Sequence, residues 1–289
     1  MTIALKTARA QRYAADGYLA IENFVDSAAC GRLIDRAAEL VDEFDPEAHR
    51  SVFTTHEQER TSDEYFLASG DKTRFFFESE AFTADGKLAV AKEYSINKLG
   101  HAMHDLDPVF DAFSRNPKLA SLASEIGLVD PLLLQSMYIF KNPFIGGEVT
   151  CHQDSTFLYT NPMTCTGFWF ALQDATTENG CLWAIPGAHL DQTGHNGLRK
   201  RFVRDDPPND AGGTSFITYA DDIAIDGAIP LEAPAGTLIV LHGLLPHFSS
   251  ANRSAKSRHA YSLHVIDANS QYPEENWLKR PQSLSLRGF

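Results

Sequence analysis

A chain of 289 residues, 43% of them apolar, is long enough to bury a large core. Its 38 acidic residues outnumber its 25 basic ones, and the formal charge of −13, with no long basic run, argues against nucleic acid or an anionic membrane as the main partner. The length fits one large domain as well as two small ones, and we favour a single domain over residues 1–289.

The cysteines and the N-terminus bear on the cellular setting. The four cysteines form no Cys-x-x-Cys pair and no dense framework, which favours a reduced, intracellular environment. Residues 1–18 contain no uninterrupted apolar segment of signal-peptide length, and no later stretch approaches the roughly 20 apolar residues of a membrane span. We therefore expect a cytoplasmic protein with no membrane contact and no obligate protein partner evident in the sequence.

The first 130 residues carry mostly helical patterns. From the expected cap at Asp26 up to Pro46, apolar residues recur at spacings of three and four, which predicts an amphipathic helix. The same reasoning predicts further helices over 6–16, 95–104 and 117–126, the last capped by Asn116, and strands over 18–24 and 74–78. Residues 47–72 are polar, and we expect His49 and His56 to lie there in a solvated loop.

The rest of the chain is rich in short apolar runs separated by Gly and Pro. It predicts strands over 132–141, 148–154, 167–172, 181–185, 236–242 and 258–265. Many short strands after a helical first third indicate a mainly β fold with flanking helices, built on a jelly-roll or cupin-like double-stranded β-helix. The helical part should lie mostly in 1–130 and the β part mostly in 131–268. Residues 191–215, rich in Gly, Asp, Asn and Pro, suggest a long loop that serves as a lid.

The first candidate functional pattern is His152-Gln153-Asp154. If residues 148–154 end a strand, the two outer side chains point to the same face. His247, from a distant strand, would complete the 2-His-1-carboxylate triad that holds non-haem Fe(II) and leaves positions open for substrates and O2. A hydrogen-bonded structural pair is the alternative for His152 and Asp154, and His242 is the rival of His247.

A second group of residues follows His247. Arg258 lies eleven positions later (258 − 247), on the expected next strand, and Ser249 lies between them. A guanidinium binds a carboxylate through two hydrogen bonds, to which a serine hydroxyl adds one more. Together with an iron triad, this pair describes a receptor for 2-oxoglutarate. Arg253 competes with Arg258, but its surroundings resemble a turn. His189, His195, His259 and His264 receive no role.

These motifs, in their order and spacing, resemble the phytanoyl-CoA dioxygenase family. The resemblance rests on 152–154, 180–189 and 247–249, followed by Asn252, Ser254 and Arg258. It extends through 65–72, 74–78, 95–101 and 135–141, and so covers nearly the whole chain, most weakly at 187–230 and the C-terminal tail.

The resemblance implies an enzyme that uses Fe(II), 2-oxoglutarate and O2, and couples hydroxylation of a C–H bond to decarboxylation of 2-oxoglutarate to succinate and CO2. It implies iron on His152, Asp154 and His247 and cosubstrate on Arg258 and Ser249, with further contacts from Lys98, Met137, Gln153 and Trp169. Without the resemblance, Lys98, Met137 and Trp169 would be interpreted as structural.

The charge of the chain does not favour a polyanionic acyl-CoA, so we expect a small or mid-sized organic substrate. Candidate pocket walls are Phe75, Phe77, Phe157 and Tyr159, together with the loop at 191–215. Two other functions remain open. One is a catalytically silent metal-binding β-barrel that acts as a sensor, and the other is a cupin-type metalloenzyme that uses no keto acid.

Overall fold

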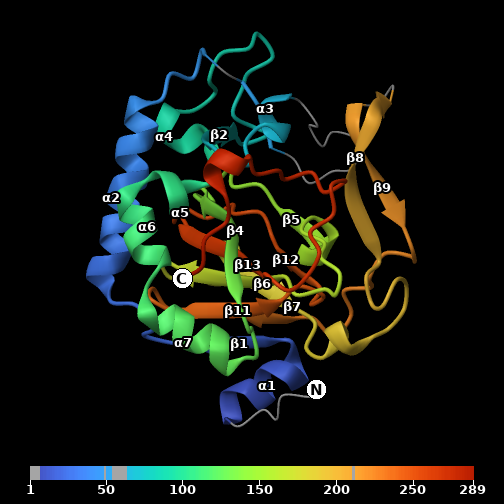
Figure 1. The fold of residues 1–289 in the computed structure, drawn as a ribbon. Coiled ribbons are helices and arrows are strands. Elements are labelled where there is room, and N and C mark those ends of the chain that lie inside the picture. Colours follow the sequence, from blue (N-terminus) through green and yellow to red (C-terminus); the bar gives the residue numbers. More distant parts are fainter. Residues whose placement is uncertain (1–6, 49, 54–63, 210–211) are drawn as a thin grey trace.

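The computed structural model describes residues 7–48, 50–53, 64–209 and 212–289. Antiparallel strands form a seven-stranded sheet, a four-stranded sheet and a two-stranded ribbon. In Figure 1 the helices α2, α5 and α6 lie on one side of the molecule and the ribbon on the opposite side. The predicted loop histidines His49 and His56 lie outside the described residues.

The major sheet has the strand order β1-β11-β6-β13-β4-β3-β2. Its strands are β1 (Tyr18–Ile21), β2 (Thr73–Phe77), β3 (Ile96–His101), β4 (Pro131–Ile139), β6 (Thr166–Ala171), β11 (Leu238–His242) and β13 (Ala260–Asp267). Every residue of β13 is buried, because side chains on both faces are covered. Leu263 and Val265 face the helices, whereas Ser262 and His264 line a cavity on the other face.

The minor sheet has the order β10-β7-β12-β5. Its strands are β5 (Val149–His152), β7 (Leu182–Ala184), β10 (Ile229–Leu231) and β12 (His247–Ser249). The ribbon consists of β8 (Lys200–Asn209) and β9 (Gly212–Thr218). Because residues of both larger sheets line the same cavity, the cavity lies between them.

The helices are α1 (Ala8–Asp16), α2 (Ser27–Glu43), α3 (Glu64–Leu67), α4 (Lys92–Ser95), α5 (Met103–Leu106), α6 (Pro108–Ser114) and α7 (Pro117–Glu125), with 3₁₀ turns η1 (Asp154–Thr156), η2 (Ala188–Leu190) and η3 (Gln282–Leu284). Residues of α2, α5, α6 and α7 pack against the outer face of the major sheet, whereas Phe66 of α3 lines the cavity. As predicted, Asp26 caps α2 by accepting a hydrogen bond from the amide of Ala29, and Asn116 caps α7. None of the helices in the described ranges is long and apolar enough to cross a membrane.

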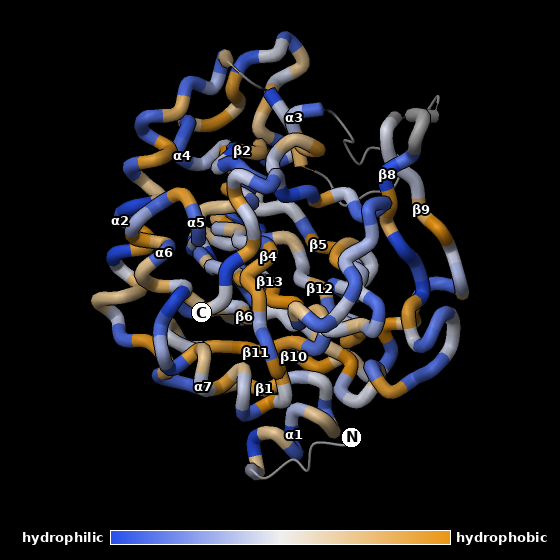
Figure 2. The backbone as a smooth tube through the Cα atoms, in the orientation of Figure 1, coloured by the Kyte–Doolittle hydropathy of each residue, from blue (hydrophilic) through white to orange (hydrophobic). Residues whose placement is uncertain are grey.

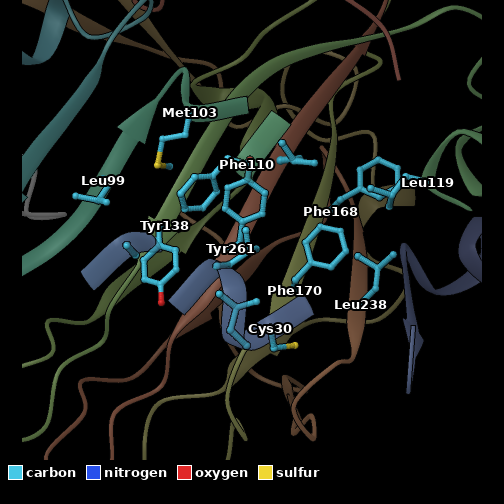
Figure 3. Close-up of a cluster of buried hydrophobic side chains, with 14 of the residues drawn as sticks. Cys30, Leu99, Met103, Phe110, Leu119, Tyr138, Phe168, Phe170, Leu238 and Tyr261 are labelled. Atoms are coloured by element: carbon cyan, nitrogen blue, oxygen red, sulfur yellow. The ribbon is translucent and has the colours of Figure 1, made fainter. Parts of the chain in front are cut away.

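The main hydrophobic core lies between these helices and the major sheet. Figure 3 shows Phe110 of α6 against Tyr261 of β13 and Tyr138 of β4, and the ring centroids of Phe110 and Tyr261 lie 5.2 Å apart. Figure 2 shows the hydrophobic colours gathered on the interior strands, with polar residues frequent on the surrounding helices. Each large side chain buried in this way stabilises the fold by about 1.5–3 kcal/mol.

Two predicted elements differ from the structure. The helix expected over 95–104 is wrong, because residues 96–101 form β3, a strand buried throughout and hydrogen-bonded to β2 and β4. Ile96 and Leu99, three residues apart, fit a helical period as well as a buried strand. The long loop expected over 191–215 is also wrong in part, since β8 and β9 pair over most of 200–218. The overall prediction of a mainly β fold with flanking helices is confirmed.

Candidate iron and cosubstrate site

The pairing of β5 with β12 brings His152 and His247 together. The two residues are direct partners in the antiparallel register, and their ring centroids lie 4.3 Å apart. Asp154 follows one extended residue after β5 and begins η1. Its Oδ1 lies 3.5 Å from His152 Nε2 and 3.6 Å from His247 Nε2. One ligand atom from each of the three residues lies within 4.8 Å of the others, so the predicted triad converges.

Backbone carbonyls fix the orientation of both imidazoles. His152 Nδ1 lies 2.9 Å from the carbonyl oxygen of Thr150, and His247 Nδ1 lies 3.0 Å from that of Leu245. A carbonyl only accepts hydrogen bonds, so both Nδ1 atoms carry the proton and both Nε2 atoms present a lone pair beside the carboxylate. Two imidazole nitrogens and one carboxylate oxygen on one side of a cavity fit non-haem Fe(II).

Burial determines the charges at this cluster. It lowers the pKa of His247 to about 4, so this imidazole is neutral at pH 7. Burial alone would raise the pKa of Asp154, but the imidazoles of His264 and His247 and the hydrogen bond with His152 lower it well below its ordinary value. The cluster therefore offers an ionised carboxylate beside a neutral imidazole, which are the protonation states that metal binding requires.

The position of the Asp154 carboxylate depends on Gly167, a residue that the sequence analysis did not single out. A Cβ added to Gly167 of β6 would lie 3.0 Å from Asp154 Oδ2, closer than most side chains tolerate. On the adjacent strand, His264 Nε2 lies 3.4 Å from the same oxygen. His264 had been given no role, yet the two-residue alternation of β13 places it on the cavity face. Gly167 and His264 thus define where the carboxylate lies.

A cavity of about 160 Å³ adjoins the triad between the two sheets. Predicted cosubstrate residues among those that line it are Lys98 of β3, Met137 of β4, Trp169 of β6, Ser249 of β12 and Arg258. Arg258 lies two residues before β13 rather than within it, so the expected strand over 258–265 began too early.

Arg258 is the most deeply placed cation of this cavity, with 2% of the residue exposed. Its Nε donates to the carbonyl of Gly180 at 3.0 Å, and its guanidinium carbon lies 5.3 Å from the ring centroid of Trp169. Its Nη1 is buried and has no hydrogen-bond partner among the described residues. Burial lowers the pKa of Arg258 to about 10, so the group is cationic at pH 7. A buried, unpartnered guanidinium N–H in a cavity wall fits a carboxylate ligand.

Lys98 and Met137 lie on neighbouring strands of the major sheet, on the cavity side. The ammonium of Lys98 lies 3.0 Å from the ring centroid of Phe53. Ser249 Oγ accepts a hydrogen bond from Lys141 Nζ at 2.8 Å, a contact that the sequence analysis missed because Lys141 closes a strand-like run and has no motif of its own.

Gln153 is placed differently from the other predicted cosubstrate residues. It is buried and is not among the residues that line the cavity. Its Nε2 donates to the carbonyls of Gly197 and Leu244 at 2.8 and 2.9 Å, and its Oε1 accepts from the amide of Arg199 at 3.0 Å. The amide thus holds two loops beside Asp154 and has no hydrogen left for a ligand.

The prediction of which aromatic residues line the cavity is only partly correct. Phe157 lines the cavity, but Phe75 and Phe77 pack in the helix-side core and Tyr159 packs in a separate cluster with Leu198. The aromatic residues found in the wall, besides Phe157 and Trp169, are Phe53, Phe66, Phe168, Phe202, Phe248 and Trp277. Phe202 belongs to β8, so the segment predicted as a lid does contribute to the wall, as a strand.

His242 and Arg253, the alternatives to His247 and Arg258 in the sequence analysis, lie outside the cavity. His242 packs against His189, with ring centroids 4.9 Å apart, and its Nδ1 accepts from the amide of Leu244. Arg253 is exposed and forms an ion pair with Glu80 at 2.6 Å. Neither lines the cavity.

Comparison with known proteins agrees with this geometry. The chain is 47% identical over 265 residues to a phytanoyl-CoA dioxygenase of Arabidopsis thaliana, covering 91% of this chain and 90% of that protein. It is 42% identical over 288 residues to mouse phytanoyl-CoA dioxygenase domain-containing protein 1, covering 97% of each. A crystal structure of EctD from S. alaskensis with 2-oxoglutarate and 5-hydroxyectoine matches with a TM-score of 0.62 and 19% identity, covering 100% of this chain and 86% of that one. The structural match supports the predicted double-stranded β-helix.

The family model described as phytanoyl-CoA dioxygenase (PhyH) matches residues 13–260. That match spans both the helical first part and the sheets that carry the triad. The chain therefore belongs to the phytanoyl-CoA dioxygenase family, and with it to the dioxygenases that use Fe(II), 2-oxoglutarate and O2.

Proposed function

We propose that this protein hydroxylates a small or mid-sized organic substrate and couples that reaction to decarboxylation of 2-oxoglutarate to succinate and CO2. His152, Asp154 and His247 hold the iron. Arg258 and Ser249 hold the far carboxylate of 2-oxoglutarate, with Lys98, Met137 and Trp169 in contact with the cosubstrate. The observation that carries the proposal is the convergence of three ligand atoms within 4.8 Å in the wall of a cavity. The same wall contains a buried guanidinium N–H of Arg258 that has no partner in the described part of the chain.

The residues of the chain bind the metal, orient the cosubstrate and exclude water from the site. When bound, Fe(II) with 2-oxoglutarate and O2 supplies the oxidising chemistry that hydroxylates a C–H bond. The carbonyls of Thr150 and Leu245 keep the Nδ1 protons in place, so the Nε2 lone pairs stay directed at the metal position. Arg258 orients the cosubstrate by fixing the end remote from the iron. No acid or base of the protein is required.

The cavity supports a compact substrate. The keto acid and the reacting part of the substrate share the cavity between the sheets. Its wall is predominantly aromatic and aliphatic, and Asp154, an iron ligand in this proposal, is its only acidic residue in the described part of the chain. The lysine and arginine that line it in the described part of the chain, Lys98 and Arg258, are both assigned to the keto acid in this proposal, so we do not assign the polyanionic acyl-CoA that the names of the relatives suggest.

We also propose that residues 1–289 act as one dioxygenase domain, with the helical part mostly in 1–130 and the β-helix core mostly in 131–268. One hydrophobic core supports this, because it contains Leu33 of α2 and Leu99 of β3 together with Phe168 and Val265 of the later strands. The strands β1, β2 and β3 of the first part belong to the major sheet, which ties the two parts together.

The test is release of succinate from 2-oxoglutarate in the presence of Fe(II) and O2, with or without added substrate. The purified protein should produce succinate, and the His152→Ala variant should not. A protein that binds iron and 2-oxoglutarate without turnover would be a sensor. A protein whose reaction is independent of 2-oxoglutarate would belong to the cupin-type metalloenzymes that need no keto acid. Either result would overturn the proposal.

A further inference from the structure

A buried lysine lies directly behind the cosubstrate serine. Lys141 follows β4, and only 2% of the residue is exposed. Its ammonium donates to the carbonyl oxygen of Gly147 at 2.6 Å and to Ser249 Oγ at 2.8 Å. Ser249 lines the cavity, whereas Lys141 does not. The lysine therefore reaches the cavity only through the serine hydroxyl.

This placement of Lys141 is costly to the fold. Burial lowers the pKa of Lys141 well below its ordinary value, because the charged form loses its hydration. Its backbone φ of 43° lies in the left-handed region, which residues with a Cβ seldom adopt. The acceptors of its Nζ among the described residues, the carbonyl of Gly147 and Ser249 Oγ, are both uncharged. The nearby Glu78 directs Oε2 to Asn97 and to the amide of Gly147. Packing alone does not account for a lysine with these properties.

A glycine joins this lysine to the arginine of the site. Gly180 has a φ of 84°, and its carbonyl accepts the hydrogen bond from Arg258 Nε. A Cβ at Gly180 would lie 2.6 Å from Lys141 Cε, so the absence of a side chain makes room for the lysine. The backbone carbonyl of Lys141 in turn accepts from the amide of Arg258 at 3.2 Å. Lys141, Gly180 and Arg258 thus form one connected unit around Ser249.

The direction of the Lys141–Ser249 hydrogen bond determines what the serine hydroxyl can donate to. In its charged form, Lys141 has three hydrogens to donate on Nζ and no lone pair to accept with, and Nζ is the donor in its contact with Ser249 Oγ. Ser249 Oγ is therefore the acceptor in this contact, and its own hydrogen is left to donate to another group. Because Ser249 lies in the same cavity wall as Arg258, that hydrogen and the unpartnered Arg258 Nη1 are both suited to a carboxylate.

We propose that Lys141 is a positioning residue that makes Ser249 an obligate donor and so selects keto acids with a second carboxylate. This inference rests on the proposed function, since it concerns the far end of 2-oxoglutarate. Lys141 does not touch the cosubstrate. It acts through the serine hydroxyl, which it polarises and orients, so its effect should vanish when that hydroxyl is absent.

The test compares two keto acids that differ only in the far carboxylate. Binding of 2-oxoglutarate and of 2-oxopentanoate to anaerobic Fe(II)-loaded protein is measured by isothermal titration calorimetry, for the wild type and Lys141→Met. We expect the variant to bind 2-oxoglutarate about tenfold more weakly, as for loss of a charge-assisted hydrogen bond, and to bind 2-oxopentanoate within twofold of the wild type. The inference would be overturned if Lys141→Met weakened binding of both keto acids equally, or if it weakened binding of neither.

A double-mutant cycle separates action through Ser249 from a general structural effect. In the Ser249→Ala background, Lys141→Met should change the affinity for 2-oxoglutarate by less than about threefold. A full tenfold loss in that background would contradict the proposal. Asn142→Ala is the matched control, because Asn142 is the buried neighbour that donates to the carbonyl of Ile96 at 2.7 Å and does not line the cavity. It should lower the melting temperature and leave the preference between the keto acids unchanged.

Binding of the two keto acids to the wild type distinguishes failure of the proposed function from failure of the role of Lys141. If the wild type fails to bind 2-oxoglutarate, the proposed function fails. If the wild type binds it and discriminates against 2-oxopentanoate while Lys141→Met does so equally well, only the role of Lys141 fails.

Discussion

His152 and His247 are direct partners across the antiparallel pair of β5 and β12, so a backbone register brings two imidazoles 95 positions apart in sequence (247 − 152) to a ring separation of 4.3 Å. A shift of one residue would turn one imidazole to the other face of the sheet. Strand pairing therefore determines the metal site as much as the identity of its ligands does.

The first prediction concerns the assignment of the distant histidine. Replacing His247 with Ala should abolish stoichiometric Fe(II) binding, because only two of the three proposed ligands remain. Metal content after anaerobic loading and desalting measures this. His242→Ala is the matched control, since His242 packs on His189 outside the triad and should leave the iron content near that of the wild type. Loss of iron in the control and retention in His247→Ala would reverse the assignment.

The second prediction concerns the arginine. Arg258→Met should weaken binding of 2-oxoglutarate by about 30-fold or more, because it removes the buried cation that faces the carboxylate. Calorimetric titration of the iron-loaded protein gives the affinity. Arg253→Met removes a cation of the same kind from an exposed ion pair with Glu80, and should change the affinity by less than twofold. Equal effects of the two replacements would show that general charge, rather than a specific contact, attracts the keto acid.

The third prediction concerns the glycine beside Asp154. Gly167→Ala places a methyl group 3.0 Å from Asp154 Oδ2 and 3.6 Å from Leu241 Cβ, so the carboxylate must move. We expect the affinity for Fe(II) to fall about 10- to 100-fold with all three ligands still present, as for other changes next to metal ligands. The control Gly31→Ala adds a methyl group in α2 where nothing lies within 4 Å, and should raise stability by about 0.5–1 kcal/mol without affecting iron. Unchanged iron affinity in Gly167→Ala would show that the carboxylate has room to move.

The fourth prediction concerns pH and stability. Burial lowers the pKa of His242 and of His259 from 6.5 to about 4. Between these values the unfolded chain binds a proton that the folded chain does not, so the free energy of unfolding falls as the pH falls from about 6.5 to about 4 and levels off above 6.5. Denaturant titrations at several pH values measure the slope. His259→Gln removes one of the groups that titrate in this range, so its slope should be smaller, and an identical slope would contradict the assignment of His259.

The triad and the cosubstrate cation could be predicted from the sequence because iron chemistry restricts the residue types. Two imidazoles, a carboxylate and a guanidinium must occur in a fixed order along the strands, and His152, Asp154, His247 and Arg258 do so. Asp154 was expected to end a strand over 148–154, whereas β5 ends at His152 and Asp154 begins a 3₁₀ turn. The extended residue between them keeps both side chains convergent.

The missed features are those whose meaning depends on tertiary packing. A strand buried on both faces has no alternation of apolar and polar residues, so β3 resembled a helix. Lys141 and His264 lie in strand-like runs where a polar residue suggests an exposed edge, and only the neighbouring sheet shows that they face the site. Phe75 and Phe77 were assigned to the cavity wall because of their aromatic content, which does not distinguish a core from a pocket.

The central claim is that one ferrous ion and one keto acid share the cavity between the two sheets. An anaerobic crystal structure with Fe(II) and 2-oxoglutarate tests it most directly. The account predicts iron bound by His152 Nε2, His247 Nε2 and Asp154 Oδ1, and a carboxylate of 2-oxoglutarate hydrogen-bonded to Arg258 Nη1 and to Ser249 Oγ. Iron bound elsewhere, or a keto acid that leaves Arg258 without contact, would contradict it.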